Sequence, residues 1–575
     1  MGLEEWHGSR RSRGEVGPLM IEVSNISVGL NALDGTDAAE LRAVRGAVRR
    51  MLHLAPDDIA SLELRKRSID ARKRSDVHLT CTARVALRGG GNAERALLQK
   101  LRKRRVGKQV RQVDAQTVSW PQALAAPSDE RPVVVGAGCA GLFCALALAE
   151  AGYAPILVER GDGSRERTKA IETFNQTGVL DPESNIQFGL GGAGTFSDGK
   201  LATGTKSPSH RLILETLVAA GAPERILWDA KPHVGSDILP TVVENVLARI
   251  RELGGEVRLR TRMTDIDVTG GKVRSATLET RTESGLMREE RLAASQVVLA
   301  CGHSARDVYQ LLLARGVTLE RKTFAMGVRI EHLQSAIDQA QFGPAAGHPG
   351  LGAAPYKLAV HLPNGRSAFS FCMCPGGYVV AAASEKGGVV TNGMSLSDRA
   401  GTNANSGLLA NVLPEDLPGD DVLAGVELQR TCERAAFAAG GGGYVAPAQL
   451  VGDFLASQPS SAGASVVPTY PRGVSWGAID GCLPAYVTET LRGAIPLMGR
   501  RLHGFDAAEA VLTGVETRSS SPVRVTRGED GQSLGTRGLF PCGEGGGYAG
   551  GIMSAAADGI RCAQWVMAAH KDESN

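Results

Sequence analysis

A glycine-rich turn near residue 136 points most directly to a bound ligand. The turn, Gly136-Ala137-Gly138-Cys139-Ala140-Gly141, lies between a β-rich run at 131–135 and an apolar helical segment at 142–151. In a GxGxxG turn the first glycine allows the tight bend, the second lets the backbone approach a pyrophosphate, and the third permits close packing of helix on strand. Amides and the dipole at the helix start stabilise the phosphates. We therefore predict a dinucleotide site contacted by Gly136, Gly138, Cys139, Ala140 and Gly141.

An acidic residue supports this prediction. Glu159 ends the next predicted strand, at 154–159, about 20 residues beyond the turn, where a carboxylate would accept hydrogen bonds from the adenosine ribose hydroxyls. Arg160 adjoins it, and we include both residues in the predicted site. Because an acid at this strand end disfavours a 2′-phosphate, the site is expected to prefer FAD or NAD over NADP.

Three later segments favour FAD over NAD. Residues 189–200 form a glycine-dense loop whose small residues could lie flat against a large planar ligand, although a mobile surface loop is the alternative. Residues 297–302 indicate a buried strand, and residues 539–553 indicate a strand, a glycine-rich turn and the start of a helix. A simple NAD dehydrogenase does not need a C-terminal segment that returns to the nucleotide-binding domain. The predicted cofactor contacts in these segments are Gly192, Thr195, Gly302, Gly543, Glu544, Gly551 and Ile552.

The sequence leaves the catalytic residues unknown, with two candidates. In the 189–200 loop, Lys200 could stabilise an anionic flavin, and Asp198 could shape the loop by capping. Ordinary solvated loop charges are the alternative. We find no paired metal-ligand spacing and predict no metal.

Several other side chains leave alternatives open. Cys372 and Cys374 could be a strained redox pair, but the period of a regular strand sends both to one face, which favours buried structural thiols. His303 could donate a proton or be a hydrogen-bonded loop residue. Arg518 and Arg524 could bind an anionic substrate or a nicotinamide phosphate, or they could be solvated arginines on a surface hairpin.

The periodicity of apolar residues predicts the elements that position these groups. The N-terminal part follows a β-α-β-β-α order, and 117–130 indicates a linker. After the first β-α-β unit, a helix at 239–253, a strand at 256–262, a meander at 272–293 and a strand at 296–300 are expected. The strand-rich segments 324–371 and 378–394 suit an inserted sheet domain, and 538–541 and 554–570 indicate a final strand and helix.

The expected fold class is α/β: a Rossmann-like FAD-binding domain with an inserted β-rich substrate domain and a small α+β N-terminal domain. The predicted boundaries are 20–125 for the N-terminal domain, 126–325 for the first part of the FAD-binding domain, 326–500 for the inserted substrate or cap domain, and 501–575 for the C-terminal return. We find no internal repeat.

Composition limits the classes of protein further. The net charge of +3 over 575 residues gives no argument for nucleic acid, and the basic run at 100–111 is better explained as a solvated helix end than as a binding surface. Ten scattered cysteines fit a reducing compartment, and no stretch suits a membrane span. We expect a cytoplasmic protein. An organelle such as a plastid is the alternative, weakened because residues 1–17 carry glutamates as well as arginines.

Several segments along nearly the whole chain match a known family. They are 67–72, 185–200, Cys372-Met373-Cys374-Pro375-Gly376-Gly377, Thr391-Asn392-Gly393-Met394, 447–449 and 514–524. On these segments the chain resembles the uncharacterized FAD-dependent dehydrogenases of bacteria and plastids, which are glutathione-reductase-type FAD/NAD(P)-binding oxidoreductases. The resemblance implies a glutathione-reductase-type FAD fold with an added N-terminal domain, and it implies little about the substrate. Cys139 stands where many relatives carry proline.

The leading hypothesis is an FAD-dependent oxidoreductase, a dehydrogenase or reductase, that moves hydride or electrons through bound flavin to an unidentified small-molecule substrate, with NADH or NADPH as a candidate electron donor. One alternative on the same scaffold is a flavin monooxygenase or a prenyl reductase. Another is a flavoprotein with structural FAD that acts as an RNA-associated binding protein. The oligomeric state and the role of the N-terminal domain do not follow from the sequence.

Overall fold

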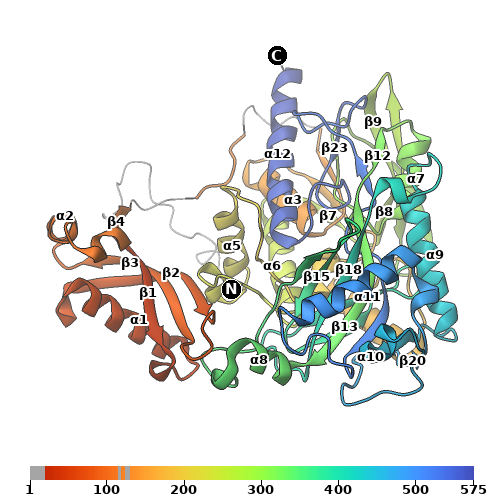
Figure 1. Ribbon diagram of the computed structural model, residues 1–575. Coiled ribbons are helices and arrows are strands. Elements are labelled where there is room, and N and C mark those ends of the chain that lie inside the picture. The colour runs from red at the N-terminus through yellow and green to blue at the C-terminus, as the bar shows by residue number, and fades with distance from the viewer. Residues whose placement is uncertain (1–19, 114–117, 124–129, 575) are drawn as a thin grey trace. The chain divides into compact units, whose positions relative to one another are not determined.

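The computed structural model describes residues 20–113, 118–123 and 130–574 (Figure 1). Part of the predicted linker, at 117 and 124–129, and the opening residues 1–17 lie outside the described residues. The chain divides into two compact units. The first unit comprises Met1–Ser119, Leu214–Pro232 and Ser335–Ala354, and the second comprises Trp120–Ile213, His233–Gln334 and Pro355–Asn575. The first unit therefore includes two distant segments that the predicted N-terminal domain does not.

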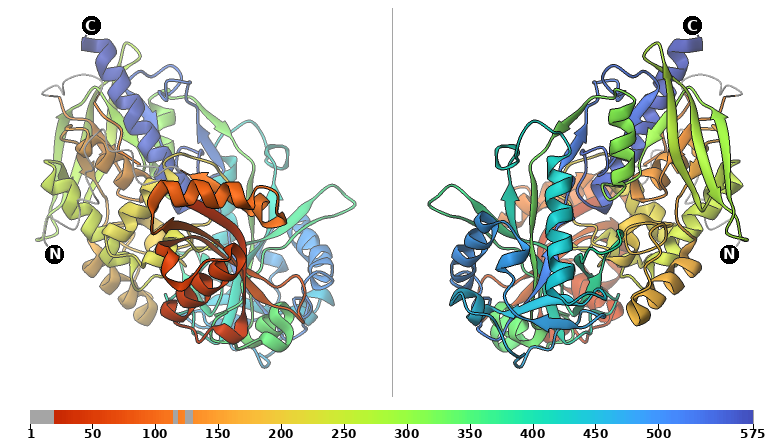
Figure 2. Two further views of the ribbon diagram at one scale, coloured as in Figure 1. Left: turned by 90° about the vertical axis from the view of Figure 1, so that its left-hand side faces the viewer. Right: turned by 90° about the vertical axis from the view of Figure 1, so that its right-hand side faces the viewer.

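An antiparallel sheet in the order β2-β3-β1-β4 forms the first unit, with α1 and α2 packed on it. Side chains of β3 alternate between buried and half-buried, because one face of the sheet is covered. Both helices cover that same face (Figure 2). The predicted β-α-β-β-α order is confirmed, and β4 completes it. The elements are β1 (Met20–Gly29), α1 (Asp37–Leu52), β2 (Ile59–Asp70), β3 (His78–Leu87), α2 (Gly90–Leu101) and β4 (Val110–Val113).

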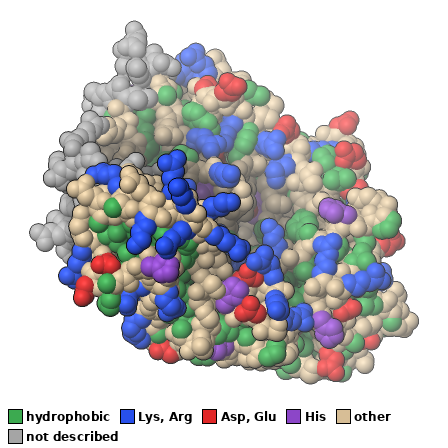
Figure 3. Space-filling view, turned by 60° about the vertical axis from the view of Figure 1, so that its left-hand side comes forward, with side chains coloured by type: hydrophobic (Ala, Val, Ile, Leu, Met, Phe, Trp, Pro, Cys, Tyr) green, Lys and Arg blue, Asp and Glu red, His purple; other side chains and the backbone are tan. Residues whose placement is uncertain are grey.

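The basic run at 100–111 lies at the surface. Arg102, Lys103, Arg104 and Arg105, which follow α2, are exposed. On the face shown in Figure 3, Lys and Arg side chains gather toward the middle, and Asp and Glu side chains lie mostly nearer the rim. The basic run therefore has the exposure expected of a solvated helix end.

The nucleotide-binding part of the second unit is a five-stranded sheet in the order β23-β11-β5-β6-β7, in which all neighbouring strands are parallel. Since parallel strands end at the same edge, the turns after β5, β6, β11 and β23 meet there. The first β-α-β unit, the later strands and the return of the C-terminal segment are confirmed. The elements are β5 (Val133–Val135), α3 (Cys139–Glu150), β6 (Ile156–Val158), α6 (Leu239–Glu252), β7 (Glu256–Arg258), β11 (Val297–Leu299), β23 (Leu539–Pro541) and α12 (Ile552–Ser574).

Helix α3 is buried on all sides. Ten consecutive residues, 140–149, are buried. The helix lies against the sheet, and both α12 and α6 pack on it (Figure 1). The predicted meander is also confirmed, as β8 (Thr261–Thr269), β9 (Lys272–Arg281) and β10 (Met287–Ala293) form an antiparallel sheet.

A second large sheet has seven strands in the order β14-β15-β18-β13-β21-β19-β20. Its central strand β13 is buried along almost its full length, which explains its lack of alternation. Strand β21 extends this sheet past the predicted boundary at residue 500. The strands are β13 (Phe324–Leu333), β14 (Ala359–His361), β15 (Ser367–Cys374), β18 (Asn403–Val412), β19 (Ala446–Leu450), β20 (Val474–Trp476) and β21 (Val511–Glu516).

The remaining elements cover or connect these sheets. Two-stranded sheets join β12 to β22 and β16 to β17. None of the helices in the described part of the chain combines the length and apolar character that crossing a bilayer requires. The bounds are α4 (Ser164–Thr177), α5 (His210–Ala219), α7 (Arg306–Ala314), β12 (Leu319–Arg321), α8 (Gln334–Phe342), β16 (Gly377–Ala381), β17 (Thr391–Ser395), α9 (Ala424–Ala439), α10 (Val451–Leu455), α11 (Ala485–Gly499) and β22 (Val523–Val525).

Candidate functional site

The turn between β5 and α3 has the backbone geometry that its glycines predict. Gly136 adopts φ +99°, and a side chain on it would collide with the backbone of Ala300. A side chain on Gly141 would collide with the carbonyl of Gly136. Gly138 is the N-cap of α3 and supplies no side-chain cap. The first amides of α3 are therefore available to an anion.

Gly138 differs from the other two glycines of the turn. A side chain placed on it would approach no protein atom closer than the Cα of Gly192, at 3.9 Å. Gly550, on the same pocket, has no protein atom within 4 Å of such a side chain. Packing within the protein therefore does not require glycine at either position, and both leave room for a ligand. The residues present fit the close approach of a dinucleotide.

Glu159 lies at the end of β6 and is 5% exposed. Its carboxylate accepts hydrogen bonds from the backbone N–H groups of Ala137 at 2.8 Å, Gly161 at 3.0 Å and Gly189 at 2.9 Å. It thus joins the glycine turn to the 189–200 loop. A carboxylate offers about four acceptor positions, so one remains for a ribose hydroxyl. Arg160 pairs with Glu183 and Asp307 and stacks on Phe188.

One pocket in the second unit contains most of the predicted cofactor contacts. Gly141 is not among its lining residues and packs under the turn. Thr195 is buried beside the carbonyl of Leu190, and the N–H of Gly543 donates to Asp558, so neither lines the pocket. The predicted residues that line it are Gly136, Gly138, Cys139, Ala140, Glu159, Arg160, Gly192, Gly302, Glu544, Gly551 and Ile552.

Part of the pocket wall comes from residues that were not among the cofactor contacts predicted from the sequence. Cys372 from β15, Asn392 from β17 and Glu516 from β21 line the same pocket as the glycine turn. All three lie in segments that carry the family resemblance, so the signal was present in the sequence. The sequence does not indicate that the fold brings these three residues to the same pocket as the glycine turn.

The two catalytic candidates lie beside the pocket and do not line it. Asp198 is fully buried and accepts a 2.7 Å hydrogen bond from Arg399. Lys200 Nζ lies 3.9 Å from Asp198. Burial opposes ionisation of Asp198, but Lys200 and Arg399 outweigh it and hold the pKa of the carboxyl below its ordinary value. These contacts give Asp198 a role in holding the loop.

His303 and Glu544 line the pocket near the start of α12. His303 Nε2 lies 3.0 Å from the carbonyl of Arg518, and Nδ1 lies 3.7 Å from the Glu544 carboxylate. Burial lowers the pKa of His303 to about 4 and raises the pKa of Glu544 to about 7. At neutral pH the imidazole is therefore uncharged. Because Nε2–H donates to the carbonyl, Nδ1 faces Glu544 as an acceptor.

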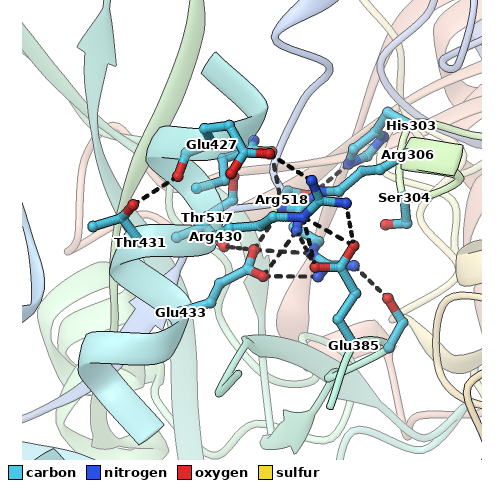
Figure 4. Close-up of polar contacts among 12 residues, drawn as sticks. His303, Ser304, Arg306, Glu385, Glu427, Arg430, Thr431, Glu433, Thr517 and Arg518 are labelled. Atoms are coloured by element: carbon cyan, nitrogen blue, oxygen red, sulfur yellow. Dashed lines mark hydrogen bonds and ion pairs between the residues drawn. The ribbon is translucent and has the colours of Figure 1, made fainter. Parts of the chain in front are cut away.

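A buried cluster of charges stands behind this part of the pocket (Figure 4). Glu433 of α9 accepts hydrogen bonds from both Arg306 and Arg518, and Thr517 donates to it at 2.8 Å. The Arg518 residue is 5% exposed, so the alternative of a solvated surface arginine is wrong for it. Arg524 is half-buried and pairs with Glu320 at 2.8 Å.

The parallel sheet, the glycine turn and the pocket together define an FAD-binding flavoprotein, and comparisons with known proteins agree. A model of the FAD binding domain matches residues 131–173, and a model described as the C-terminal domain of FAD-dependent proteins matches 323–519. A domain of unknown function matches 20–86. The cofactor of this chain is FAD, and its general class is flavin oxidoreductase.

A full-length relative shows the family. The chain is 41% identical over 551 residues to an uncharacterized protein of Clostridium beijerinckii, covering 96% of this chain and 99% of that one. The chain belongs to the same family of FAD-dependent proteins as that relative.

Solved flavoproteins are more distant. The flavin-dependent brominase Bmp2 is 13% identical, covering 76% of this chain and 79% of that one, with a TM-score of 0.34. A geranylgeranyl bacteriochlorophyll reductase-like protein from Thermoplasma acidophilum is 12% identical, covering 78% and 80%, with a TM-score of 0.33. Similarity at this level carries no conclusion about substrate or reaction.

Proposed function

We propose that the protein is an FAD-dependent dehydrogenase or reductase that passes electrons through its flavin to a small-molecule substrate, with NADH or NADPH as the electron donor. The observation that carries the proposal is that one pocket is lined both by the glycine turn and by Cys372, Asn392 and Glu516. A ligand held by the turn would thus share its pocket with the ionisable side chains of Cys372 and Glu516.

The nucleotide end of the pocket would hold the non-reacting part of the cofactor. The amides at Gly138 and the start of α3 would bind the pyrophosphate, and the remaining acceptor position of Glu159 would take a hydrogen bond from one ribose hydroxyl. Gly551 and Ile552 line the pocket where α12 begins. The positive end of that helix would stabilise negative charge on a reduced ring. FAD supplies the electron transfer when bound.

Two carboxyl groups on the pocket could exchange protons near neutral pH. Burial raises the pKa of Glu516 to about 7, although Arg329 pairs with it and opposes the shift. Burial likewise raises the pKa of Glu544 to about 7. Groups with pKa values near the working pH are efficient proton donors and acceptors. The pocket can therefore both orient a substrate and take up the proton that accompanies a two-electron step.

The test is anaerobic mixing of the purified, FAD-loaded protein with NADH or NADPH while flavin absorbance is followed. We expect bleaching of the oxidised flavin, and then recovery when a metabolite pool containing the acceptor is added. Free FAD mixed with the Gly138→Val protein is the control for non-enzymatic reduction. If neither nicotinamide bleaches the flavin, the proposed electron donor is wrong. Oxygen consumption coupled to substrate hydroxylation would favour a monooxygenase.

A further inference from the structure

Cys372 and Cys374 occupy different positions relative to the pocket. Cys372 is half-buried and lines the pocket together with Glu544 and Ile552, whereas Cys374 is fully buried and does not line it. Both are free thiols in the structure. One residue of the pair therefore borders the pocket, and the other is sheltered.

The strand that carries both cysteines is not regular. Strand β15 pairs Phe371 with Gly407 and Cys374 with Asn405, so three steps along β15 match two along β18. Cys372 sits in this bulge with φ +44°, a conformation uncommon for a residue with a side chain. The bulge therefore interrupts the regular period of two on which the sequence prediction for these two thiols relied.

The bulge matters for the distance between the two thiols. In a regular strand, Cα atoms two residues apart are about 6.6–6.8 Å apart, at the upper limit of the range of about 4.4–6.8 Å that a disulfide spans. An extra residue bends the strand at this point. The Cys374 thiol donates a hydrogen bond to the carbonyl oxygen of Cys372 at 3.2 Å. The buried thiol thus lies against the residue that lines the pocket.

The surroundings of Cys372 favour its thiolate. A hydrogen bond from Cys374 is the largest cause that lowers the pKa of Cys372 below its ordinary value, and Lys200 and Arg329 add to it. Burial and Asp198 act in the opposite direction, and Cys372 is also close enough to Glu516 and Glu544 to affect their ionisation. Arg329 Nη1 donates to the Cys372 carbonyl at 3.0 Å, which places the cation beside the thiol. The thiolate is the form that attacks in disulfide formation.

We propose that Cys372 and Cys374 form a redox-active dithiol at the flavin end of the pocket and exchange two electrons with FAD. In the oxidising direction both S–H bonds break and one S–S bond forms. The two electrons and one proton pass to the flavin, and the second proton passes to solvent or to the Glu544 carboxylate. The reverse step restores both thiols. This pair deepens the proposed function, on which it rests, because it lets one protein molecule store four electrons.

Counting thiols in the wild-type protein tests the proposal without any substitution. The air-oxidised, FAD-loaded protein is denatured under acid, its free thiols are alkylated, and its peptides are mapped by mass spectrometry. We expect two fewer alkylated thiols than the ten cysteines of the sequence, with the missing pair at Cys372 and Cys374. After anaerobic reduction of the flavin, all ten should be alkylated. Ten alkylated thiols in the oxidised sample would overturn the proposal.

Anaerobic titration with dithionite provides an independent measurement. The wild-type protein should take up four electrons per flavin, and Cys374→Ser should take up two, because a single thiol cannot form the disulfide. Cys482→Ser is the matched control, since Cys482 is a buried cysteine that does not line the pocket, and it should take up four. Uptake of two electrons by wild-type protein contradicts the dithiol.

These readouts separate this inference from the proposed function. Reduction of the flavin by NADH or NADPH with uptake of only two electrons would keep the oxidoreductase and reject the dithiol. Uptake of four electrons from dithionite, together with no reduction by either nicotinamide, would keep the dithiol and reject the electron donor.

Discussion

The carboxylate of Glu433 and the guanidinium of Arg518 form a fully buried ion pair, with Arg518 Nη2 2.8 Å from Glu433 Oε2 and each side chain 2% exposed. Arg306 completes the arrangement at 2.8 Å from the other oxygen (Figure 4). Burial opposes ionisation of Glu433, but Arg518 and Arg306 outweigh it and hold the pKa of the carboxyl well below its ordinary value. One carboxylate thus pairs with two buried cations, and Arg518, which lines the pocket, is one of them. Glu385 supplies a second negative charge at 2.9 Å from Arg306.

Removing this carboxylate should destabilise the second unit strongly. Glu433→Ala removes the buried carboxylate that Arg306 and Arg518 share and leaves Glu385 as the remaining acidic partner of Arg306. Breaking a buried pair costs about 3–5 kcal/mol. We expect a lower free energy of unfolding in denaturant titrations followed by tryptophan fluorescence. We also expect the variant to bind FAD less tightly. Glu427→Ala, on the same helix α9 but with a 54% exposed side chain, is the control and should change the midpoint little. Equal effects of the two variants would contradict the assignment.

Gly138→Val should weaken FAD binding while the fold is retained. A Cβ atom at this position meets no protein atom closer than 3.9 Å, so the added side chain would extend into the pocket where we expect the pyrophosphate to bind. We expect the Kd for FAD to rise at least about tenfold, which corresponds to about 1.4 kcal/mol. The measurement is fluorescence titration of apoprotein with FAD, with circular dichroism as the check on folding. Gly204→Val, in an exposed segment with no neighbouring atoms, is the control and should bind normally.

The stability of the protein should depend on pH through Glu544. Burial raises the pKa of this carboxyl from its ordinary value of 4.5 to about 7 in the folded protein. Between these values the folded state keeps a proton that the unfolded state has released, so stability falls as pH rises through this window. Glu544→Gln should flatten that slope in thermal unfolding, whereas the exposed Glu529→Gln should not. A variant that keeps the wild-type slope would exclude Glu544 as its origin.

Arg67 should hold together the three segments of the first unit. Its side chain donates to Glu40 at 2.8 Å and to the carbonyl of Gly350 at 2.9 Å, and its backbone N–H donates to Trp228 at 2.7 Å. Hydrogen bonds to charged groups contribute about 1.5–3 kcal/mol each. Arg67→Met should therefore accelerate limited proteolysis within Leu214–Pro232 and Ser335–Ala354. The nearby Arg72→Ala removes a 90% exposed side chain and should leave the cleavage rate unchanged.

Much of the secondary structure could be predicted because its signals are local. The alternation in β3 and the apolar stripe of α6 follow from neighbours in sequence. Strand β4, only four residues long, carries too short a pattern to be recognised and exists because β1 pairs with it. Helices α9 and α11 were likewise not anticipated within the strand-rich insertion. Of these three elements, β4 is the one that long-range strand pairing decided.

The candidate site divides in the same way. Thr195 was predicted from its place in a glycine-rich loop, yet its hydroxyl faces the Leu190 carbonyl, because loop position does not determine side-chain direction. Arg518 was left between a binding residue and a solvated one, and only its contact with Glu433, 85 residues away, shows that it is buried. The residues next to Thr195 and Arg518 in the sequence do not indicate where either side chain lies.

By itself, the sequence determined the turn of the dinucleotide cradle, since the positive φ of Gly136 and the close contact of Gly141 with the Gly136 carbonyl depend on residues within the turn. Only the tertiary structure decided what faces that cradle. Cys372, Asn392 and Glu516 come from three strands separated by up to 144 residues (516 − 372) and reach one pocket through sheet pairing. Such pairing is set by contacts between distant segments, which local residue patterns do not specify.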